Sequence, residues 1–312
     1  MRKITLLLLA LFGWCALSAQ DVVCDTFHYA TNEGVELYLD RYTVAETPEP
    51  RPCMIFAFGG GFVRGERNTP FYLTYFESLA RDGIVVVSID YRLGLSNITN
   101  VSGINDLIDA MSRAVGIAVE DIYDATNFIL ENADEWGVDR NCIMLSGSSA
   151  GAIASVQAEW LRSCGSDIAA VLPADFSYAA VVSCAGAIFS VDGKPKFKSE
   201  AAPMLLFHGS SDSNVPYNKA SIMGIGFYGS KYIAKQLDKV DSPYLFYSVE
   251  YADHSLAGTP LIDKCDLIKQ FIRDYVKDGR RMRTIVEVDI LGGEKRPTRF
   301  SAMDYVKTNY AR

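Results

Sequence analysis

The residues that most clearly suggest chemistry form a short run in the middle of the chain, Gly147-Ser148-Ser149-Ala150-Gly151. A hydrophobic stretch, predicted as a strand over 142–146, precedes the run, and a helix is predicted over 150–162. A serine on a sharp turn between a strand and a helix exposes its hydroxyl, and glycines on both sides leave room for the packed helix. The start of that helix offers free N–H groups to a developing oxyanion. The run therefore predicts Ser149 as a nucleophile.

A second glycine-rich run, Phe58-Gly59-Gly60-Gly61-Phe62, follows another predicted buried strand at 54–58. Three glycines let the chain turn with its N–H groups facing a cavity. Two of these amides, together with the N–H of Ala150, would hold the negative oxygen of a tetrahedral intermediate. A plain tight turn is the alternative. A phosphate-binding loop is not indicated, because neither of the two glycine patterns typical of such loops is present.

The general base must come from three histidines, His28, His208 and His254. In strand-turn-helix serine sites the acid and then the histidine follow the serine along the chain, which excludes His28. His254 lies in the loop after a strand predicted at 244–250, and we predict it as the base. His208 is expected to pack at the end of its own strand and to shape the loop that follows.

Asp212 is the predicted acid, because it lies in the loop after a strand predicted at 203–208. The order Ser149, Asp212, His254 then places each group beyond the carboxyl end of its own strand, where open α/β sheets have their sites. In such a set the histidine takes the serine proton, and the aspartate fixes the histidine tautomer and stabilises the imidazolium.

Three other aspartates are candidates for the acid. Asp253 is adjacent to the predicted base, and side chains of neighbouring residues rarely face each other across a hydrogen bond. Asp238 and Asp241 precede a predicted strand, which puts them at the wrong edge of the sheet. Asp212 is therefore preferred.

The hydrophobic pattern places these loops on a mostly parallel sheet of about eight strands with helices on both faces, an α/β fold. Strands are predicted at 26–31, 35–42, 54–58, 84–89, 142–146, 179–184, 203–208 and 244–250. Helices are predicted at 71–81, 104–133, 150–162, 217–238 and 261–278. The two stretches where a lid would be inserted, 91–103 and 185–202, are short and predict a minimal lid. Residues 280–312 are expected to add a strand and a helix on the sheet edge.

Composition supports a globular protein. The chain has 312 residues, of which 49% are hydrophobic and 22% are charged, and this excludes disordered, collagen-like and coiled-coil proteins. The net charge of −8 gives no electrostatic reason to bind nucleic acid or an anionic membrane. No internal repeat or linker is seen, so we expect one domain over 20–312. The oligomeric state is not predicted.

The N-terminus is typical of a secretory signal peptide. Two basic residues are followed by an apolar run at 4–14 and by small residues up to Ala19. We therefore expect residues 1–19 to be removed and the protein to be secreted or periplasmic, with no stable membrane insertion. A lipoprotein attached through Cys15 is less favoured, because the bulky Trp14 precedes that cysteine.

Six cysteines remain after such cleavage, and an oxidising compartment would permit disulfides without fixing their pairing. Buried free thiols with one or two bridges are expected among Cys24, Cys53, Cys142, Cys164, Cys184 and Cys265. The cysteines and histidines do not have the spacing of a zinc site.

Four motifs together resemble the α/β-hydrolase superfamily, and among its members the carboxylesterases of the type-B and hormone-sensitive-lipase-like groups. They are M-I-F-A-F-G-G-G-F at 54–62, S-I-D-Y-R-L-G at 88–94, W-G-V-D-R-N-C-I-M-L-S-G-S-S-A-G at 136–151 and H-G-S-S-D-S-N-V-P at 208–216. The resemblance covers about residues 50–275. It implies a nucleophile at Ser149, oxyanion donors at Gly60, Gly61 and Ala150, and Asp212 and His254 as the rest of the triad.

The expected reaction is hydrolysis of a carboxylic ester through an acyl-enzyme, which requires no metal or organic cofactor. The substrate would be a small-molecule or carbohydrate ester, and acetyl or feruloyl esters of plant polysaccharide are one hypothesis beside a general short-chain carboxylesterase. A serine peptidase of the prolyl-oligopeptidase type is an alternative, although such enzymes usually carry an extra N-terminal domain. Another is a binding protein that is not an enzyme; those relatives have typically lost the serine or the histidine, which are both present here.

Overall fold

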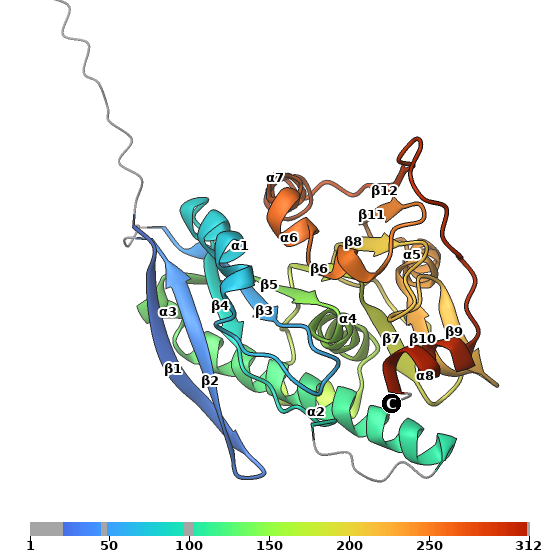
Figure 1. Ribbon diagram of the computed structural model, residues 1–312. Coiled ribbons are helices and arrows are strands. Elements are labelled where there is room, and N and C mark those ends of the chain that lie inside the picture. The colour runs from blue at the N-terminus through green and yellow to red at the C-terminus, as the bar shows by residue number, and fades with distance from the viewer. Residues whose placement is uncertain (1–20, 45–48, 97–102, 311–312) are drawn as a thin grey trace, which may run out of the picture.

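A nine-stranded sheet forms the centre of the computed structural model, which describes residues 21–44, 49–96 and 103–310 (Figure 1). Its strands are β1 (Val23–Asn32), β2 (Val35–Thr43), β3 (Arg51–Ala57), β4 (Val85–Ile89), β5 (Val138–Ser148), β6 (Ala180–Cys184), β8 (Met204–Gly209), β11 (Tyr244–Val249) and β12 (Arg283–Val288). Their spatial order is β1-β2-β4-β3-β5-β6-β8-β11-β12. Only the β1–β2 and β2–β4 pairings of this sheet are antiparallel.

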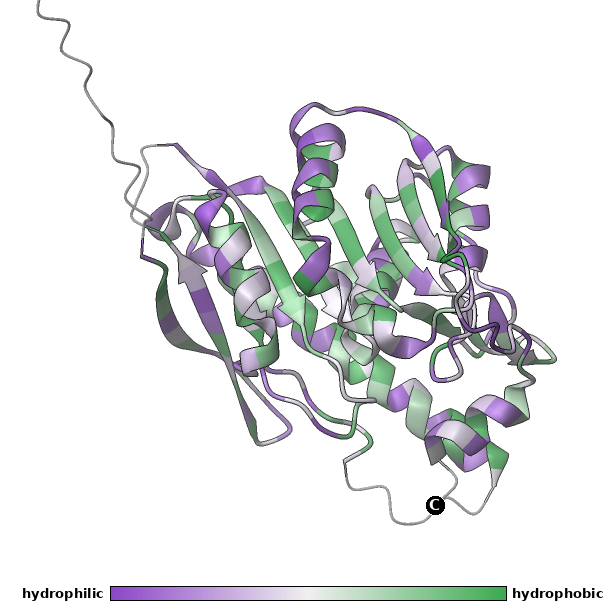
Figure 2. Cartoon of the chain, turned by 45° about the horizontal axis from the view of Figure 1, so that its top comes forward, coloured by the Kyte–Doolittle hydropathy of each residue, from purple (hydrophilic) through white to green (hydrophobic). Residues whose placement is uncertain are grey.

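Helices pack against both faces of the sheet. The α-helices are α1 (Pro70–Arg81), α2 (Ile104–Glu131), α3 (Ala133–Trp136), α4 (Ala150–Ser163), α5 (Ser230–Leu237), α6 (Pro260–Asp263), α7 (Cys265–Phe271) and α8 (Ala302–Tyr310). Helices α1, α6 and α7 contact one another, as do α2 and α4 on the other side. The central strands are therefore buried on both faces and form a hydrophobic band through the molecule (Figure 2). The predicted α/β fold with a mostly parallel sheet is confirmed.

The helix predicted over 217–238 is wrong in its first half. Strands β9 (Lys219–Ile222) and β10 (Ile225–Gly229) form a hairpin there, and only α5 is helical. Both residues of its turn, Met223 and Gly224, have positive φ angles of 52° and 92°, as a two-residue hairpin turn requires. The hairpin pairs with β7 (Ala187–Ser190) in a separate antiparallel sheet. The stretch 185–202, where a minimal lid and no strand is predicted, therefore contributes β7.

The C-terminal region follows its prediction only in part. Strand β12 does extend the sheet edge by pairing parallel to β11. Helix α8, in contrast, does not pack on that edge; it contacts β9 and the loop after β8 instead. The physical reason is that an irregular segment from 289 to 301 carries the chain away from the edge strand before α8 begins.

The six cysteines within the described residues are all free thiols, so the expectation of one or two disulfides is wrong for this structure. Cys53 and Cys184, for example, lie in β3 and β6, which are separated by β5. Burial raises the pKa of both thiols, which makes them poor nucleophiles. The predicted signal peptide lies outside the described residues. Among the residues that are described, no helix is both long and apolar enough to cross a membrane.

Candidate active site

Ser149 occupies a strained turn between β5 and α4. Its φ and ψ angles are 50° and −114°, which is uncommon for a residue with a side chain. A Cβ on Gly147 would lie 2.4 Å from the Gly151 carbonyl oxygen, and one on Gly151 would lie 2.1 Å from that of Ala57. The Ser149 amide donates to the carbonyl of Cys184 in β6 at 2.9 Å. Both flanking positions therefore require glycine, and the turn is fixed to the neighbouring strands.

The three predicted triad residues form one hydrogen-bonded relay. The Oγ atom of Ser149 lies 2.8 Å from Nε2 of His254, and Nδ1 of His254 lies 2.7 Å from Oδ2 of Asp212. A carboxylate only accepts hydrogen bonds, so Nδ1 carries the proton and Nε2 accepts from the serine hydroxyl. The side chain of His254 is 24% exposed, whereas that of Asp212 is fully buried. The imidazole of His254 can therefore be reached from solvent while the carboxylate of Asp212 is shielded.

The carboxylate of Asp212 is held by its own loop as well as by the relay. Oδ1 accepts from the backbone amides of Asn214 and Val215 at 2.8 and 2.9 Å. Burial alone would raise the pKa of this carboxyl, but hydrogen bonds and charge from His208 and His254 outweigh the burial. The pKa of Asp212 is therefore well below its usual range, and the group is a carboxylate at neutral pH.

His208 packs at the end of β8, as expected from the sequence, and it also faces the acid. It is fully buried, and its Nε2 atom lies 3.2 Å from the carbonyl oxygen of Val215 and 3.4 Å from Oδ2 of Asp212. Because a carbonyl only accepts, Nε2 carries a proton. Nδ1 lies 2.8 Å from the hydroxyl of Ser230 at the start of α5. His208 thus supports the acid and lies outside the relay.

The glycine loop passes directly beside Ser149. A Cβ on Gly59 would lie only 3.4 Å from the Ser149 Cβ. Gly60 and Gly61 have φ angles of 131° and 66°, and a Cβ on Gly60 would clash with the backbone of the same loop. Within the part of the chain that the structure describes, the amides of Gly60, Gly61 and Ala150 donate to no protein acceptor. These three amides are thus not engaged by another group among the described residues.

Two tyrosines that the sequence reasoning missed hold this loop in place. The hydroxyl of Tyr72 accepts from the Gly59 amide at 3.2 Å. Tyr91 stacks on Phe58 with ring centroids 4.4 Å apart, and its hydroxyl donates to the Phe58 carbonyl at 2.7 Å. Tyr91 lies in the S-I-D-Y-R-L-G motif, which was a usable signal. Tyr72 is one of several aromatic residues on α1, and nothing in the sequence distinguishes it.

Within the described part of the chain, the three other candidate aspartates form no hydrogen bond with His254, and each has another place or partner. Asp253 accepts from the Ser255 amide at 3.0 Å and forms an ion pair with Arg296. The hydrogen bonds from Ser255, and after them the Arg296 charge, lower the pKa of Asp253. Asp238 and Asp241 precede β11 at its amino end, away from the relay. The geometry therefore agrees with Asp212 as the histidine's partner.

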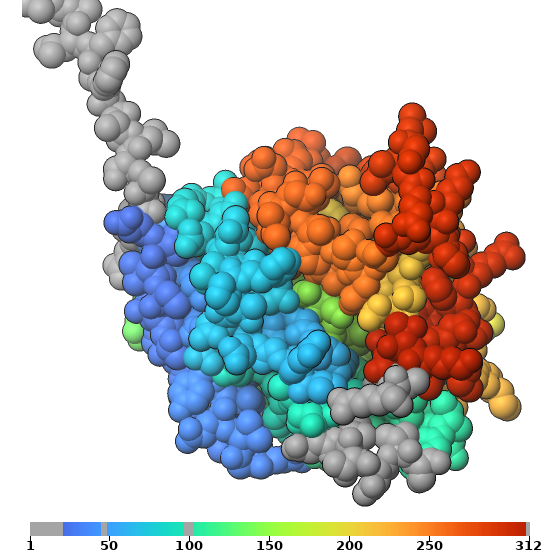
Figure 3. All heavy atoms as spheres, viewed as in Figure 1, coloured from blue at the N-terminus to red at the C-terminus, as the bar shows by residue number. Residues whose placement is uncertain are grey.

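In the space-filling view, green atoms from the middle of the chain come to the surface between the cyan segment that follows β3 and the orange segment that follows β11 (Figure 3).

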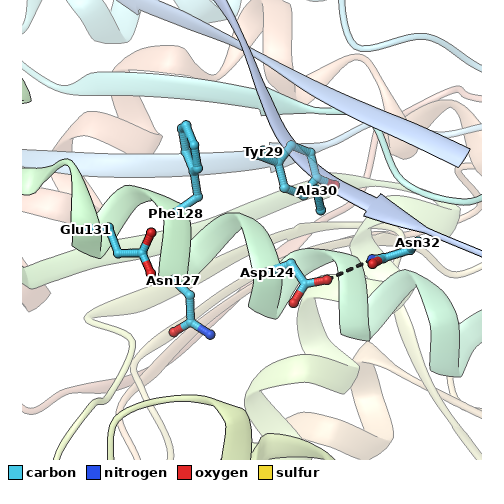
Figure 4. A pocket seen from close by; sticks show the side chains of 7 residues that line it. All are labelled: Tyr29, Ala30, Asn32, Asp124, Asn127, Phe128 and Glu131. Atoms are coloured by element: carbon cyan, nitrogen blue, oxygen red, sulfur yellow. Dashed lines mark hydrogen bonds between the residues drawn. The ribbon is translucent and has the colours of Figure 1, made fainter.

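A cavity of about 280 Å³ lies elsewhere, between β1 and α2, where Asn32 donates to Asp124 (Figure 4). It is lined by Tyr29, Ala30, Asn32, Asp124, Asn127, Phe128 and Glu131, and none of these belongs to the relay. No group of three or more His, Cys, Asp or Glu among the described residues is arranged to hold a metal ion.

Comparison with known proteins agrees with this fold. Residues 39–188 match the family model described as BD-FAE. The chain is 35% identical over 103 residues to the phenmedipham hydrolase of Pseudarthrobacter oxydans, covering 33% of this chain and 18% of that protein. It is 34% identical over 104 residues to the fumonisin B1 esterase of Sphingopyxis macrogoltabida, covering 33% of this chain and 18% of that protein. The chain thus spans less than a fifth of the length of each of these two relatives.

Solved structures extend the likeness to most of the chain. The apo form of Thermogutta terrifontis esterase 2 superposes with a TM-score of 0.56 at 21% identity, covering 81% of this chain and 94% of that chain. The same enzyme with propionate bound gives a TM-score of 0.57 at 22% identity, covering 81% of this chain and 93% of that chain. The fold is therefore the α/β-hydrolase fold of these esterases.

Proposed function

We propose that the protein is a serine esterase that hydrolyses carboxylic esters through an acyl-enzyme on Ser149. The observation that carries this proposal is the unbroken relay from Ser149 through His254 to Asp212, with hydrogen bonds of 2.8 and 2.7 Å. The matched stretch of two curated hydrolases and the α/β-hydrolase fold support it.

In the acylation half-reaction, His254 Nε2 accepts the Ser149 proton while Oγ forms a bond to the ester carbonyl carbon. The carbonyl oxygen becomes negatively charged and is held by backbone amides of Gly60, Gly61 and Ala150. Ala150 begins α4, so the helix N-terminus adds partial positive charge to that oxygen. The tetrahedral intermediate collapses as the bond to the leaving alcohol breaks, and His254 gives that alcohol its proton.

In deacylation, His254 accepts a proton from a water molecule that attacks the acyl carbon. The second tetrahedral intermediate uses the same amides and releases the carboxylic acid, and the proton returns to Ser149. Asp212 stays ionised throughout, because its pKa is held well below its usual range. It keeps the Nδ1–H tautomer and stabilises the imidazolium of both half-reactions.

For the natural substrate, we propose acetyl or feruloyl esters of plant polysaccharide. Among simple aliphatic esters, we propose a preference for short acyl chains. The signal-like segment at 1–19 supports an exported enzyme, which would meet such polymers outside the cell. Mass spectrometry of the protein secreted by its native host tests export. Cleavage after residue 19 would lower its molecular mass by the mass of residues 1–19.

A panel of p-nitrophenyl esters of increasing acyl length, together with acetylated and feruloylated xylan fragments, tests the reaction and the substrate class. Ser149→Ala should abolish turnover, whereas Ser163→Ala, at the far end of α4, should leave it unchanged. A fluorophosphonate probe should add one mass label to the wild type and none to Ser149→Ala. Turnover of a prolyl-peptide amide without any ester turnover would favour the peptidase alternative. Absence of both turnover and labelling would favour the binding protein.

A further inference from the structure

The chain after β12 forms a strap, defined here as residues 289–310, that ends in α8. Because β12 runs parallel to β11, it ends at the same edge of the sheet as the relay, where the Glu250 amide donates to the Val288 carbonyl at 2.7 Å. The strap, red in Figure 1, leaves this point and runs down one side of the molecule to α8 beside β9. It therefore starts next to the loop that carries His254.

The strap contacts the acid loop, residues 210–215, at three points. The hydroxyl of Tyr305 donates to the backbone carbonyl of Asp212 at 3.0 Å. The hydroxyl of Ser211 donates to the backbone carbonyl of Arg296 at 3.3 Å, and the side-chain amide of Asn309 donates to the backbone carbonyl of Asn214 at 3.0 Å. The strap thus contacts the backbone of Asp212 itself, and it contacts the loop before and after Asp212 in the sequence.

The strap also contacts the histidine loop, residues 251–255. The guanidinium of Arg296 pairs with the carboxylate of Asp253, which in turn accepts from the Ser255 amide at 3.0 Å. Arg296 therefore reaches both loops, one through its backbone carbonyl and the other through its side chain. This connection is independent of the hydrogen bond between Asp212 and His254.

Helix α8 is anchored in a way that fixes Tyr305. The Asp304 carboxylate accepts from the Ser301 amide at 2.7 Å, and the Asp304 amide donates to the Ser301 hydroxyl at 3.2 Å, which together form a capping box. The ring of Phe300 lies 5.7 Å from that of Tyr305. The tyrosine hydroxyl is therefore presented to Asp212 by a helix with a defined start.

We propose that the strap holds the acid and histidine loops in register, with Tyr305 and Arg296 as positioning residues. The two loops are joined directly by the hydrogen bond of the relay, by the Ser211 amide, which donates to the Ala252 carbonyl at 2.9 Å, and by the Tyr251 amide, which donates to the Ser210 hydroxyl at 2.8 Å. The strap adds a further link across them from outside. It acts on the rate through the alignment of the Asp212 carboxylate with His254. The inference rests on the proposed esterase function, but its structural half can be tested without it.

The kinetic test compares Tyr305→Phe and Arg296→Gln with two matched controls. Tyr232→Phe removes another hydroxyl that donates to a carbonyl, that of Pro195, and Arg281→Gln removes another exposed arginine of an ion pair, with Glu200. With p-nitrophenyl acetate, kcat should fall about three- to tenfold for Tyr305→Phe, the worth of one neutral hydrogen bond, with KM little changed. For Arg296→Gln the fall should be about two- to fivefold, as for an exposed ion pair. The controls should stay at the wild-type rate.

A double variant separates positioning from general destabilisation. If Tyr305 acts through the Asp212 carboxylate, Tyr305→Phe should cost nothing further in an Asp212→Ala background. An equal loss in both backgrounds would overturn the proposal, because it would mean that the tyrosine only supports the fold.

Amide hydrogen exchange tests the strap whether or not the protein hydrolyses esters. Tyr305→Phe and Arg296→Gln should speed exchange at 210–215 and 251–255 and leave the strands unchanged. Unaltered exchange in both loops would overturn the strap even in an active enzyme. A wild-type protein without any ester turnover would contradict the proposed esterase function. The exchange result would still show whether the strap holds the two loops.

Discussion

Nε2 of His208 lies 3.4 Å from Oδ2 of Asp212, the same carboxylate oxygen that accepts the hydrogen bond from His254. One buried carboxylate thus faces two imidazoles, of which only one reaches the nucleophile. In the proposed reaction the arrangement separates two tasks: His254 moves protons, and His208 helps to hold Asp212 as an anion.

His208→Gln should lower both activity and stability. The substitution leaves Ser230 or Val215 without a buried partner, which costs about 1–3 kcal/mol of the free energy of unfolding. Urea denaturation measures this loss, and kcat for p-nitrophenyl acetate should fall about tenfold because the acid is held less firmly. His28→Gln, at an exposed histidine on β1, is the control and should change neither quantity. An unchanged kcat in His208→Gln would show that the relay does not depend on the second imidazole.

The triad should behave as one unit. Ser149→Ala and His254→Ala should each lower kcat/KM by about 10⁴- to 10⁶-fold. The double variant should be no slower than the worse single variant, because either change alone removes nucleophilic attack. Steady-state kinetics of the three proteins check this, with circular dichroism to confirm folding. Losses that multiply in the double variant would contradict the relay.

Asp212 should make the folded state sensitive to acid. A carboxyl whose pKa is lower in the folded than in the unfolded protein stabilises the fold above its unfolded pKa of about 3.9, and that stabilisation is lost as the pH falls toward the folded pKa. The free energy of unfolding should therefore drop between pH 5 and pH 3 more in the wild type than in Asp212→Asn. Urea titrations across that range measure it. Asp175→Asn, at an exposed aspartate, should follow the wild type; parallel curves for all three would contradict the prediction.

Two glycine substitutions should have opposite signs. Gly151→Ala places a Cβ 2.1 Å from the Ala57 carbonyl oxygen, so the protein should be strongly destabilised or fail to fold. Gly116 lies inside α2, where a Cβ meets nothing within 4 Å, and Gly116→Ala should add about 0.5–1 kcal/mol to the free energy of unfolding. Thermal melts compare them. A stable Gly151→Ala would mean that the turn at Ser149 is less tightly packed than the structure shows.

The sequence predicted the parts of the site whose signals are local. The run around Ser149 combines a strand, a turn and a helix within a few residues, and the loops of Asp212 and His254 directly follow hydrophobic strands. The hairpin of β9 and β10 was missed because its strands are short, and short apolar runs do not separate helix from strand by periodicity. The strap was missed for another reason: Tyr305 meets Asp212 across 93 positions, and such a contact leaves no pattern in either segment.

The members of the relay are held by different parts of the molecule. Ser149 is tied by its amide to β6 and enclosed by Gly147 and Gly151, whereas the strap behind its partners is mostly exposed, with Leu291 at 91%. Warming would therefore make the loops of Asp212 and His254 more mobile while Ser149 is still held by the folded sheet. Part of the activity would then be lost at temperatures where the sheet is still folded, and cooling would restore it.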